Sequence, residues 1–391
     1  MRVLVAEKGQ HTIEACRHLA REGHQVVLAS LPLGRLGRFP LSRSYHEVVE
    51  SDVLASDRRI EGLKRIFDRE GCDVFLPFGF RLVTEYIESS WKEPSLRMNV
   101  PYGGREEYWR LSDKSNLYRT LRGSSVPLPR SHGTVREGDT VEIGNDDFPV
   151  ILKRARGVGI KGNIILAWSK GDIESFLEGE GESEFVIQEY LPGDIFDVGG
   201  FAFEGEARYM VPQRRTVTLP LRGGVAAVND VYPDEELTGM TSEIVERAGW
   251  SGPFQAEFRW DPEGEAYKLI EVNAKLWGSL PLSLRANPDI LNMILKYATG
   301  GDPGHSLHFD TGLRYRWICG QELQALRFGS LGDWISFLGR FLGGSHYDFD
   351  LRDPVPDLMR LVHSIYQYVD TSDLPRPLVD RETHRRLNRA R

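Results

Sequence analysis

Two acids and an amide stand where a β-hairpin would bring their side chains together. Glu257 lies in the alternating run FQAEFRW (254–260), and Glu271 and Asn273 lie in YKLIEVN (267–273). The turn-rich linker DPEGEA joins the two runs and predicts antiparallel pairing. Because side chains alternate across a strand, Glu271 and Asn273 share one face, which Glu257 can reach from the paired strand. Two carboxylates and an amide oxygen suit Mg²⁺ held together with nucleotide phosphates.

A solvated polar face on an antiparallel sheet would show the same pattern, so the strands alone leave both interpretations open. The neighbouring residues favour the metal. Glu271 stands between Ile270 and Val272, and Glu257 is likewise flanked by apolar residues. An acid inside so apolar a strand is costly unless it is paired or bound to a metal.

A lysine at the end of another apolar strand is followed by three closely spaced glycines. The run PVILK ends at Lys153, and Gly157, Gly159 and Gly162 follow it in a basic segment. Glycines let backbone N–H groups approach phosphate oxygens, and the lysine adds a point charge. An ordinary hairpin turn has the same composition, and the P-loop spacing G-x-x-x-x-G-K-[ST] does not occur in the chain.

The segment FVIQEYLPGD (185–194) is a third candidate. Its strand ends in Gln188, Glu189 and Leu191 and is followed by a Pro-Gly turn and Asp194. Backbone groups of such a segment can contact an adenine, and Asp194 can lie near a ribose. Considered alone, the segment is a strand followed by a turn.

The order of these segments is more specific than any one of them. The chain runs through LSDKSNL, PVILK, the glycine loop, QEYLPGD, the basic stretch RRTVTLPLRGG, and then EF and EVN. This order resembles the ATP-grasp superfamily, and within it the carboxylate–amine ligases related to carbamoyl-phosphate synthase. The resemblance covers roughly residues 110–285.

The resemblance implies a role for each matching residue. The implied nucleotide-binding residues are Lys114, Lys153, Gly157, Gly159, Gly162, Gln188, Glu189, Leu191 and Asp194. Among them the two lysines contact phosphates, the glycine loop closes over the β- and γ-phosphates, and residues 188–191 bind adenine. The implied metal ligands are Glu257, Glu271 and Asn273.

Two positions depart from the family pattern and bear on the implied catalytic cations. Lys275 replaces the arginine that usually follows the last metal ligand and offers a point charge instead of a bidentate fork. Arg214 matches the first of two arginines three apart, but Val217 replaces the second. We therefore expect Arg214 and Lys275 to be the catalytic cations of an unusual substrate pocket. Ser279 lines the acyl site or merely starts the next helix.

The remaining chain supplies the elements that position these residues. Residues 1–105 show βα alternation and predict a small, doubly wound parallel-sheet domain, in which EKGQH replaces the glycine turn of a nicotinamide site. Residues 106–304 are the expected ATP-grasp domain. Residues 305–391 show helical spacing and predict a helical extension with a basic tail. The fold class is thus mixed, α/β and α+β.

Composition limits the partners. The net charge of -8 argues against a general nucleic-acid binder. Three scattered cysteines fit a reducing cytoplasm, and the chain has neither a signal-peptide pattern nor an apolar run of about 20 residues. We expect small-molecule carboxylate and amine substrates, no nucleic-acid or membrane partner, and a homodimer as one option.

The resemblance implies an ATP-dependent ligase that forms an amide through an acyl phosphate and releases ADP and phosphate. ATP and Mg²⁺, or Mn²⁺ in its place, are the implied cofactors. A phosphotransferase on the same scaffold and a non-catalytic nucleotide-binding protein are the alternatives, and the sequence does not identify the acid or the amine.

Overall fold

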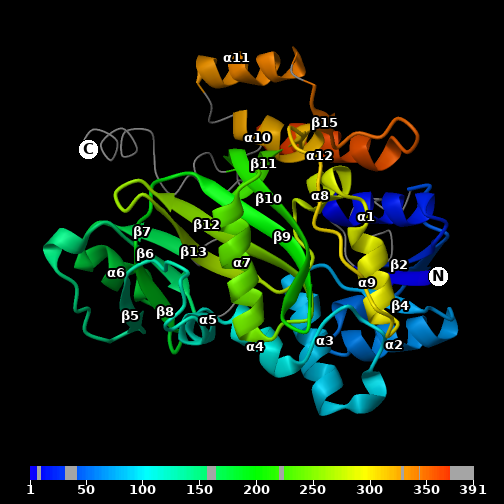
Figure 1. Cartoon of the computed structure of the whole chain (residues 1–391), viewed down its shortest axis with the longest axis horizontal. Coiled ribbons are helices and arrows are strands. Elements are labelled where there is room, and N and C mark those ends of the chain that lie inside the picture. Colours follow the sequence, from blue (N-terminus) through cyan, green and yellow to red (C-terminus); the bar gives the residue numbers. More distant parts are fainter. Residues whose placement is uncertain are drawn as a thin grey trace.

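The structure is a computed structural model of the whole chain, and it describes residues 1–6, 10–30, 42–155, 164–219, 224–326, 330–342 and 344–369. Figure 1 shows a parallel sheet at the N-terminal end, a small antiparallel sheet and a larger, mainly antiparallel sheet beyond it, and helices that cover them. The mixed fold class predicted from the sequence is confirmed.

The N-terminal region is a four-stranded parallel sheet in the order β3-β2-β1-β4. Its strands are β1 (Arg2–Val5), β2 (Gln25–Ser30), β3 (Glu47–Glu50) and β4 (Val74–Leu76). The helical segments of this region are α1 (Gln10–Arg21), η1 (Asp52–Ala55), α2 (Arg59–Arg69), α3 (Phe80–Lys92) and η2 (Pro94–Leu96). The inner strands are continuous apolar runs because helices cover both faces of such a sheet.

The strand order makes the carboxyl edge of this sheet a natural binding region. The chain moves outward from β1 to β2 and β3 and then returns to place β4 on the other side of β1. In doubly wound sheets, ligands bind outside the carboxyl ends of the strands at such a switch point. The carboxyl ends of β1 and β4 therefore flank the expected crevice.

The middle of the chain forms a small antiparallel sheet with its own core. Its order is β5 (Ser131–Val135), β8 (Phe185–Glu189), β6 (Val150–Arg154) and β7 (Ile164–Ala167). Helix α6 (Lys170–Leu177) packs its Ile173 and Leu177 into that core, and η3 (Asn145–Asp147) lies in the connection before β6. Helices α4 (Arg105–Ser112) and α5 (Lys114–Thr120) precede this sheet.

The largest sheet has seven strands in the order β13-β12-β9-β10-β11-β14-β15. They are β9 (Ile195–Phe203), β10 (Glu206–Leu219), β11 (Val225–Val231), β12 (Gly252–Asp261), β13 (Ala266–Asn273), β14 (Arg314–Arg316) and β15 (His346–Tyr347). The helices of this part are α7 (Glu235–Ala248), α8 (Leu280–Ala286) and α9 (Ile290–Ala298). A Cβ on Gly199 would lie 2.4 Å from the Trp277 ring. The glycine therefore lets this buried indole pack on β9 and fix the chain just after β13.

The C-terminal extension continues this sheet and adds helices. They are η4 (Ile318–Glu322), α10 (Leu323–Leu326), α11 (Leu331–Gly339), η5 (Arg340–Leu342) and α12 (Val355–Val369). In Figure 1, α11 lies at the outer edge of the molecule. No helix within the described residues is both long and apolar enough to cross a bilayer.

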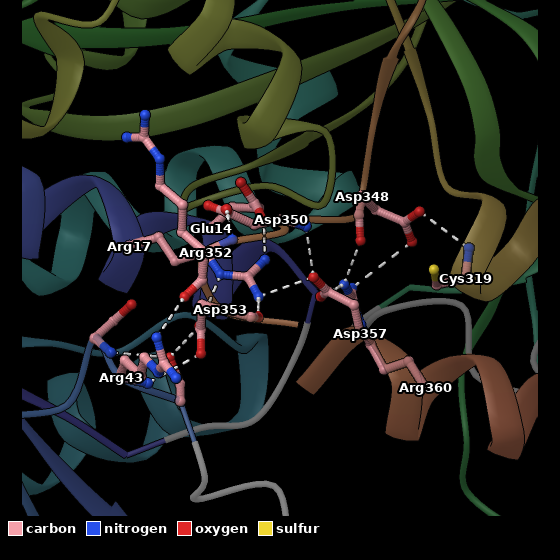
Figure 2. Close-up of polar contacts among 12 residues, drawn as sticks. Glu14, Arg17, Arg43, Cys319, Asp348, Asp350, Arg352, Asp353, Asp357 and Arg360 are labelled. Carbon is pink, nitrogen blue, oxygen red and sulfur yellow. Dashed lines mark hydrogen bonds and ion pairs between the residues drawn. The ribbon is translucent and has the colours of Figure 1, made fainter. Parts of the chain in front are cut away.

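A buried ionic network fastens the extension to α1, as Figure 2 shows. The Arg17 guanidinium, 2% exposed, donates to Glu14 Oε1 at 2.6 Å, Asp353 Oδ2 at 3.0 Å and Asp357 Oδ2 at 2.9 Å. Arg360 also donates to Asp357. Because a buried charge is costly unless it is paired, these contacts hold residues more than 300 positions apart in one arrangement.

Candidate active site

Three carboxylates form a row across neighbouring strands of the large sheet. As predicted, β12 and β13 pair in antiparallel fashion, and their register sets Glu257 opposite Glu271. The register of β12 with β9 sets Glu257 opposite Asp197 on its other side. Residues directly opposite one another lie on the same sheet face, so the three acids form a carboxylate row that requires positive charge nearby.

Lys114 and Lys153 supply part of that charge. Lys114 begins α5, where the N-cap Asp113 accepts a hydrogen bond from the backbone of Asn116, and its Nζ lies 3.1 Å from Glu271 Oε2. Burial raises the pKa of Glu271, but Lys114 and Lys153 outweigh it and bring the pKa down to about 2. Glu271 is therefore ionised at neutral pH.

Lys153 projects toward the same acids from β6 of the smaller sheet. Burial lowers its pKa and Glu271 opposes the shift, while Lys114 lowers the pKa further, to about 8. The side chain thus stays mostly charged at pH 7. Groups from α5, β6 and β13 accordingly act on one another across the junction of the two sheets.

Arg215 contacts the carboxylate row most closely, and sequence reasoning missed it together with Asp197. Its guanidinium binds Asp197 through two bonds of 2.6 and 2.7 Å, and its Nη2 lies 2.5 Å from Glu257 Oε2. Burial raises the pKa of Asp197 to about 6 even though Arg215 opposes the shift. The signal in the sequence was the Arg-Arg pair on a strand, of which only one member can face the acids.

Arg214, the predicted catalytic cation, projects from the opposite face of β10. Its Nη2 pairs with Asp194 Oδ2 at 2.5 Å at the surface, and its guanidinium lies 6.0 Å from the centre of the Phe196 ring. The structure therefore brings Arg215 rather than Arg214 to Glu257. A catalytic role for Arg214 stays a prediction.

The segment predicted to bind adenine is tied to both sheets. Gln188 donates through Nε2 to the Tyr118 hydroxyl, and its buried Oε1 has no hydrogen-bond partner among the described residues. Glu189 Oε1 accepts from Lys268 Nζ at 2.6 Å, and the Leu191 carbonyl accepts from Arg259 at 2.8 Å. The segment thus has a fixed position beside β12 and β13.

The switch point of the N-terminal sheet lies close to the residues that follow the carboxylate row. His11, in the first turn of α1, contacts Phe78 just after β4, with 5.5 Å between the ring centres. Burial lowers the pKa of His11 and the charge of Lys275 lowers it further, to about 3. The predicted cation Lys275 thus acts on the carboxyl edge of the N-terminal sheet, while its Nζ lies 3.5 Å from the Leu276 carbonyl.

A family model described as "ATP-grasp in the biosynthetic pathway with Ter operon" matches residues 182–321. Residues 182–321 are thus similar to the ATP-grasp family. It is 24% identical over 214 residues to D-aspartate ligase of Enterococcus faecium (strain Aus0004), a match that covers 49% of this chain. The match covers 50% of the curated relative, so the chain spans about half of that protein's length.

Solved structures share the fold at lower identity. The biotin carboxylase of Campylobacter jejuni superposes with a TM-score of 0.63 at 16% identity, over 80% of this chain and 74% of that one. The L-amino acid ligase of Bacillus licheniformis superposes with a TM-score of 0.58 at 13% identity, over 76% of this chain and 74% of that one. At such identities the likeness shows the fold alone.

The predicted ATP-grasp residues are only partly described. Gly157, Gly159 and Gly162 lie outside the described residues, so the glycine loop stays a prediction. Ser279 is the N-cap residue of α8, yet its buried hydroxyl bonds to no described group. Neither of its two expected roles is decided.

The donor set at the carboxylate row fits a hard cation. Glu257 and Glu271 stand opposite each other, and the Asn273 amide lies 3.2 Å from Glu271 Oε1. Within the described residues no three His, Cys, Asp or Glu side chains converge as a metal-binding group. A metal here would therefore need the Asn273 oxygen and ligand phosphates besides the two acids.

Proposed function

We propose that this chain is an ATP-dependent carboxylate–amine ligase that forms an amide through an acyl phosphate and releases ADP and phosphate. The observation that carries the proposal is the meeting of Lys114 and Lys153 with the ionised Glu271 opposite Glu257. Phosphoryl transfer depends on positioning and charge neutralisation, and this arrangement offers both. The likeness to a D-aspartate ligase supports the same reaction class.

Each group of candidate residues has its own expected role in binding ATP and the metal. Lys114 and Lys153 would hold phosphate oxygens, with Gly157, Gly159 and Gly162 closing from the side of β6. Gln188, Glu189 and Leu191 would hold the adenine, and Asp194 would lie near the ribose. Glu257, Glu271 and Asn273 would hold Mg²⁺, or Mn²⁺ in its place, and the bound metal would supply neutralisation of the phosphate charge.

The acceptor side would lie against the N-terminal domain. The substrate carboxylate attacks the γ-phosphorus, and the amine then displaces phosphate from the acyl carbon. Lys275 follows Asn273 by two residues and acts electrostatically on His11, so we assign its charge to the transferred phosphate. The switch point around Phe78 and His11 offers the amine a position next to that cation.

We place the protein in the cytoplasm and expect small-molecule substrates. The three cysteines are buried free thiols, which fits a reducing compartment.

A screen of ADP release tests the proposal. Mixed pools of carboxylic acids and amines are incubated with Mg-ATP, and the Glu271→Gln variant serves as the matched control. We expect the wild type to release ADP only when one acid and one amine are both present. The Glu271→Gln control should release none. Release that needs no amine would contradict the ligase assignment, as would equal release by the control.

A further inference from the structure

Helix α11 turns apolar side chains toward solvent. Leu331, Ile335 and Leu338 follow helical spacing along one face and are 77, 61 and 62% exposed. A surface helix ordinarily presents a polar face to water. The helix lies at the outer edge of the molecule in Figure 1, where no described element covers this face.

Helix α12 likewise buries its charged side chains and exposes apolar ones. Its charged residues Asp357 and Arg360 point inward into the buried ionic network. Its outer stripe is apolar and consists of Val355, Leu358, Val362 and Ile365, which are 40, 47, 67 and 49% exposed. The network therefore fixes α12 with its apolar stripe outward, so the exposure follows from the fold.

The inner side of α11 is occupied as well. The Arg316 guanidinium lies 5.0 Å from the Phe337 ring centre and 4.3 Å from that of Phe341, and it pairs with the buried Glu322. These contacts hold α11 through Phe337 and the following η5 through Phe341. Two apolar faces of one extension are thus left toward solvent among the described residues, which is uncommon in a soluble domain and marks an interaction surface.

The sequence that follows α12 indicates the partner. Residues 381–391, RETHRRLNRAR, contain five arginines and one glutamate in a chain whose net charge is -8. Apolar helix faces joined to a cationic segment match the surface of an anionic bilayer, where apolar side chains enter the headgroup region and arginines meet lipid phosphates. A second copy of the chain would also match the apolar faces, so the test must distinguish vesicle binding from dimerisation.

We propose that the C-terminal extension binds the surface of anionic membranes through the outer faces of α11 and α12, aided by residues 381–391. The sequence alone led us to expect no membrane partner, because it contains no spanning segment. The apolar faces become visible only when the fold shows which side of each helix is buried. Binding of this kind lies in the plane of the interface and needs no spanning helix.

Sedimentation of the full-length protein with sucrose-loaded vesicles tests the proposal. One set of vesicles contains phosphatidylcholine alone, and the other contains equimolar phosphatidylcholine and phosphatidylglycerol. We expect binding to the anionic set only, with a loss of at least about tenfold in the Ile335→Glu/Leu338→Glu variant. Arg385→Ala and Arg386→Ala should each weaken binding by about fivefold.

The control variant is Leu307→Glu, which adds one glutamate at a 50% exposed leucine outside both helices and should bind normally. Thermal melting of every variant verifies folding. Absence of binding to anionic vesicles overturns the proposal, as does equal binding by the α11 variant. A dimer in sedimentation equilibrium that Ile335→Glu/Leu338→Glu dissociates, without vesicle binding, would assign the surface to a second copy instead.

Discussion

Replacing Arg215 by methionine should destabilise the protein far more than the same change at its neighbour Arg214. Arg215 lies among Asp197, which is fully buried, and Glu257, so its loss leaves two acids without their counter-charge. Breaking a buried ion pair in this way costs about 3–5 kcal/mol. For a domain of this size, we expect the melting temperature to fall by roughly 10 °C.

Arg214→Met is the matched control. Its partner Asp194 is 57% exposed and the Arg214 side chain 44%, and an exposed pair contributes less than about 1 kcal/mol. The melting temperature of that variant should fall by no more than about 3 °C. Both variants are compared by differential scanning calorimetry without nucleotide.

The loss in Arg215→Met should also depend on pH. Burial raises the pKa of Asp197 to about 6 in the folded protein, above its unfolded value of about 3.9, and removal of Arg215 raises it further. A group whose folded pKa is raised loses its stabilising contribution as the pH increases through that pKa. Arg215→Met should therefore be least stable at pH 8 and regain part of its stability at pH 5. Equal melting temperatures of Arg215→Met and Arg214→Met at pH 8 would refute this reasoning. So would a loss of stability in Arg215→Met that is as large at pH 5 as at pH 8.

Three further predictions concern other parts of the molecule. Arg17→Met should lower the free energy of unfolding, measured with urea, by about 3–5 kcal/mol. Arg21→Met loses a partly exposed pair with Asp350 and should lower it by less than about 1 kcal/mol. Similar losses in the two variants would contradict the buried network. His11 has a folded pKa of about 3, below its usual value of 6.5, so its stabilising contribution should decline as the pH falls from 6.5. Between pH 6.5 and 5, the free energy of unfolding of the wild type should thus fall by about 2 kcal/mol more than that of His11→Gln. If the two proteins lose stability equally over this range, His11 titrates normally. Glu271→Gln should fold normally but abolish ADP formation, and near-normal turnover would exclude Glu271 as a metal ligand.

The parts of the fold that follow local patterns were predictable from the sequence. The alternating runs around Glu257 and Glu271 gave the correct hairpin, and the apolar runs of the first hundred residues gave the parallel sheet. Local periodicity carries this information because it records which side of each element is buried.

Contacts that depend on register or on distant segments were not predictable. The choice between Arg214 and Arg215 depends on the pairing of β10 with β9, which no single strand specifies. Asp197 meets Glu257 only through the register of β9 with β12. The pairing of Arg17 with Asp353 joins segments more than 300 residues apart, and neither segment carries a local signal for the other.

An oxygen-18 transfer experiment tests the central claim, that a carboxylate is activated by phosphorylation and passed to an amine. If a carboxylate oxygen attacks the γ-phosphorus, that oxygen leaves with phosphate when the amine displaces it. An acid identified in the ADP screen is labelled in its carboxylate, and the released phosphate is analysed by mass spectrometry. We predict one labelled oxygen in the phosphate, released together with the amide and only when the amine is present. Unlabelled phosphate, or a stable phosphorylated product without amide, would contradict the account.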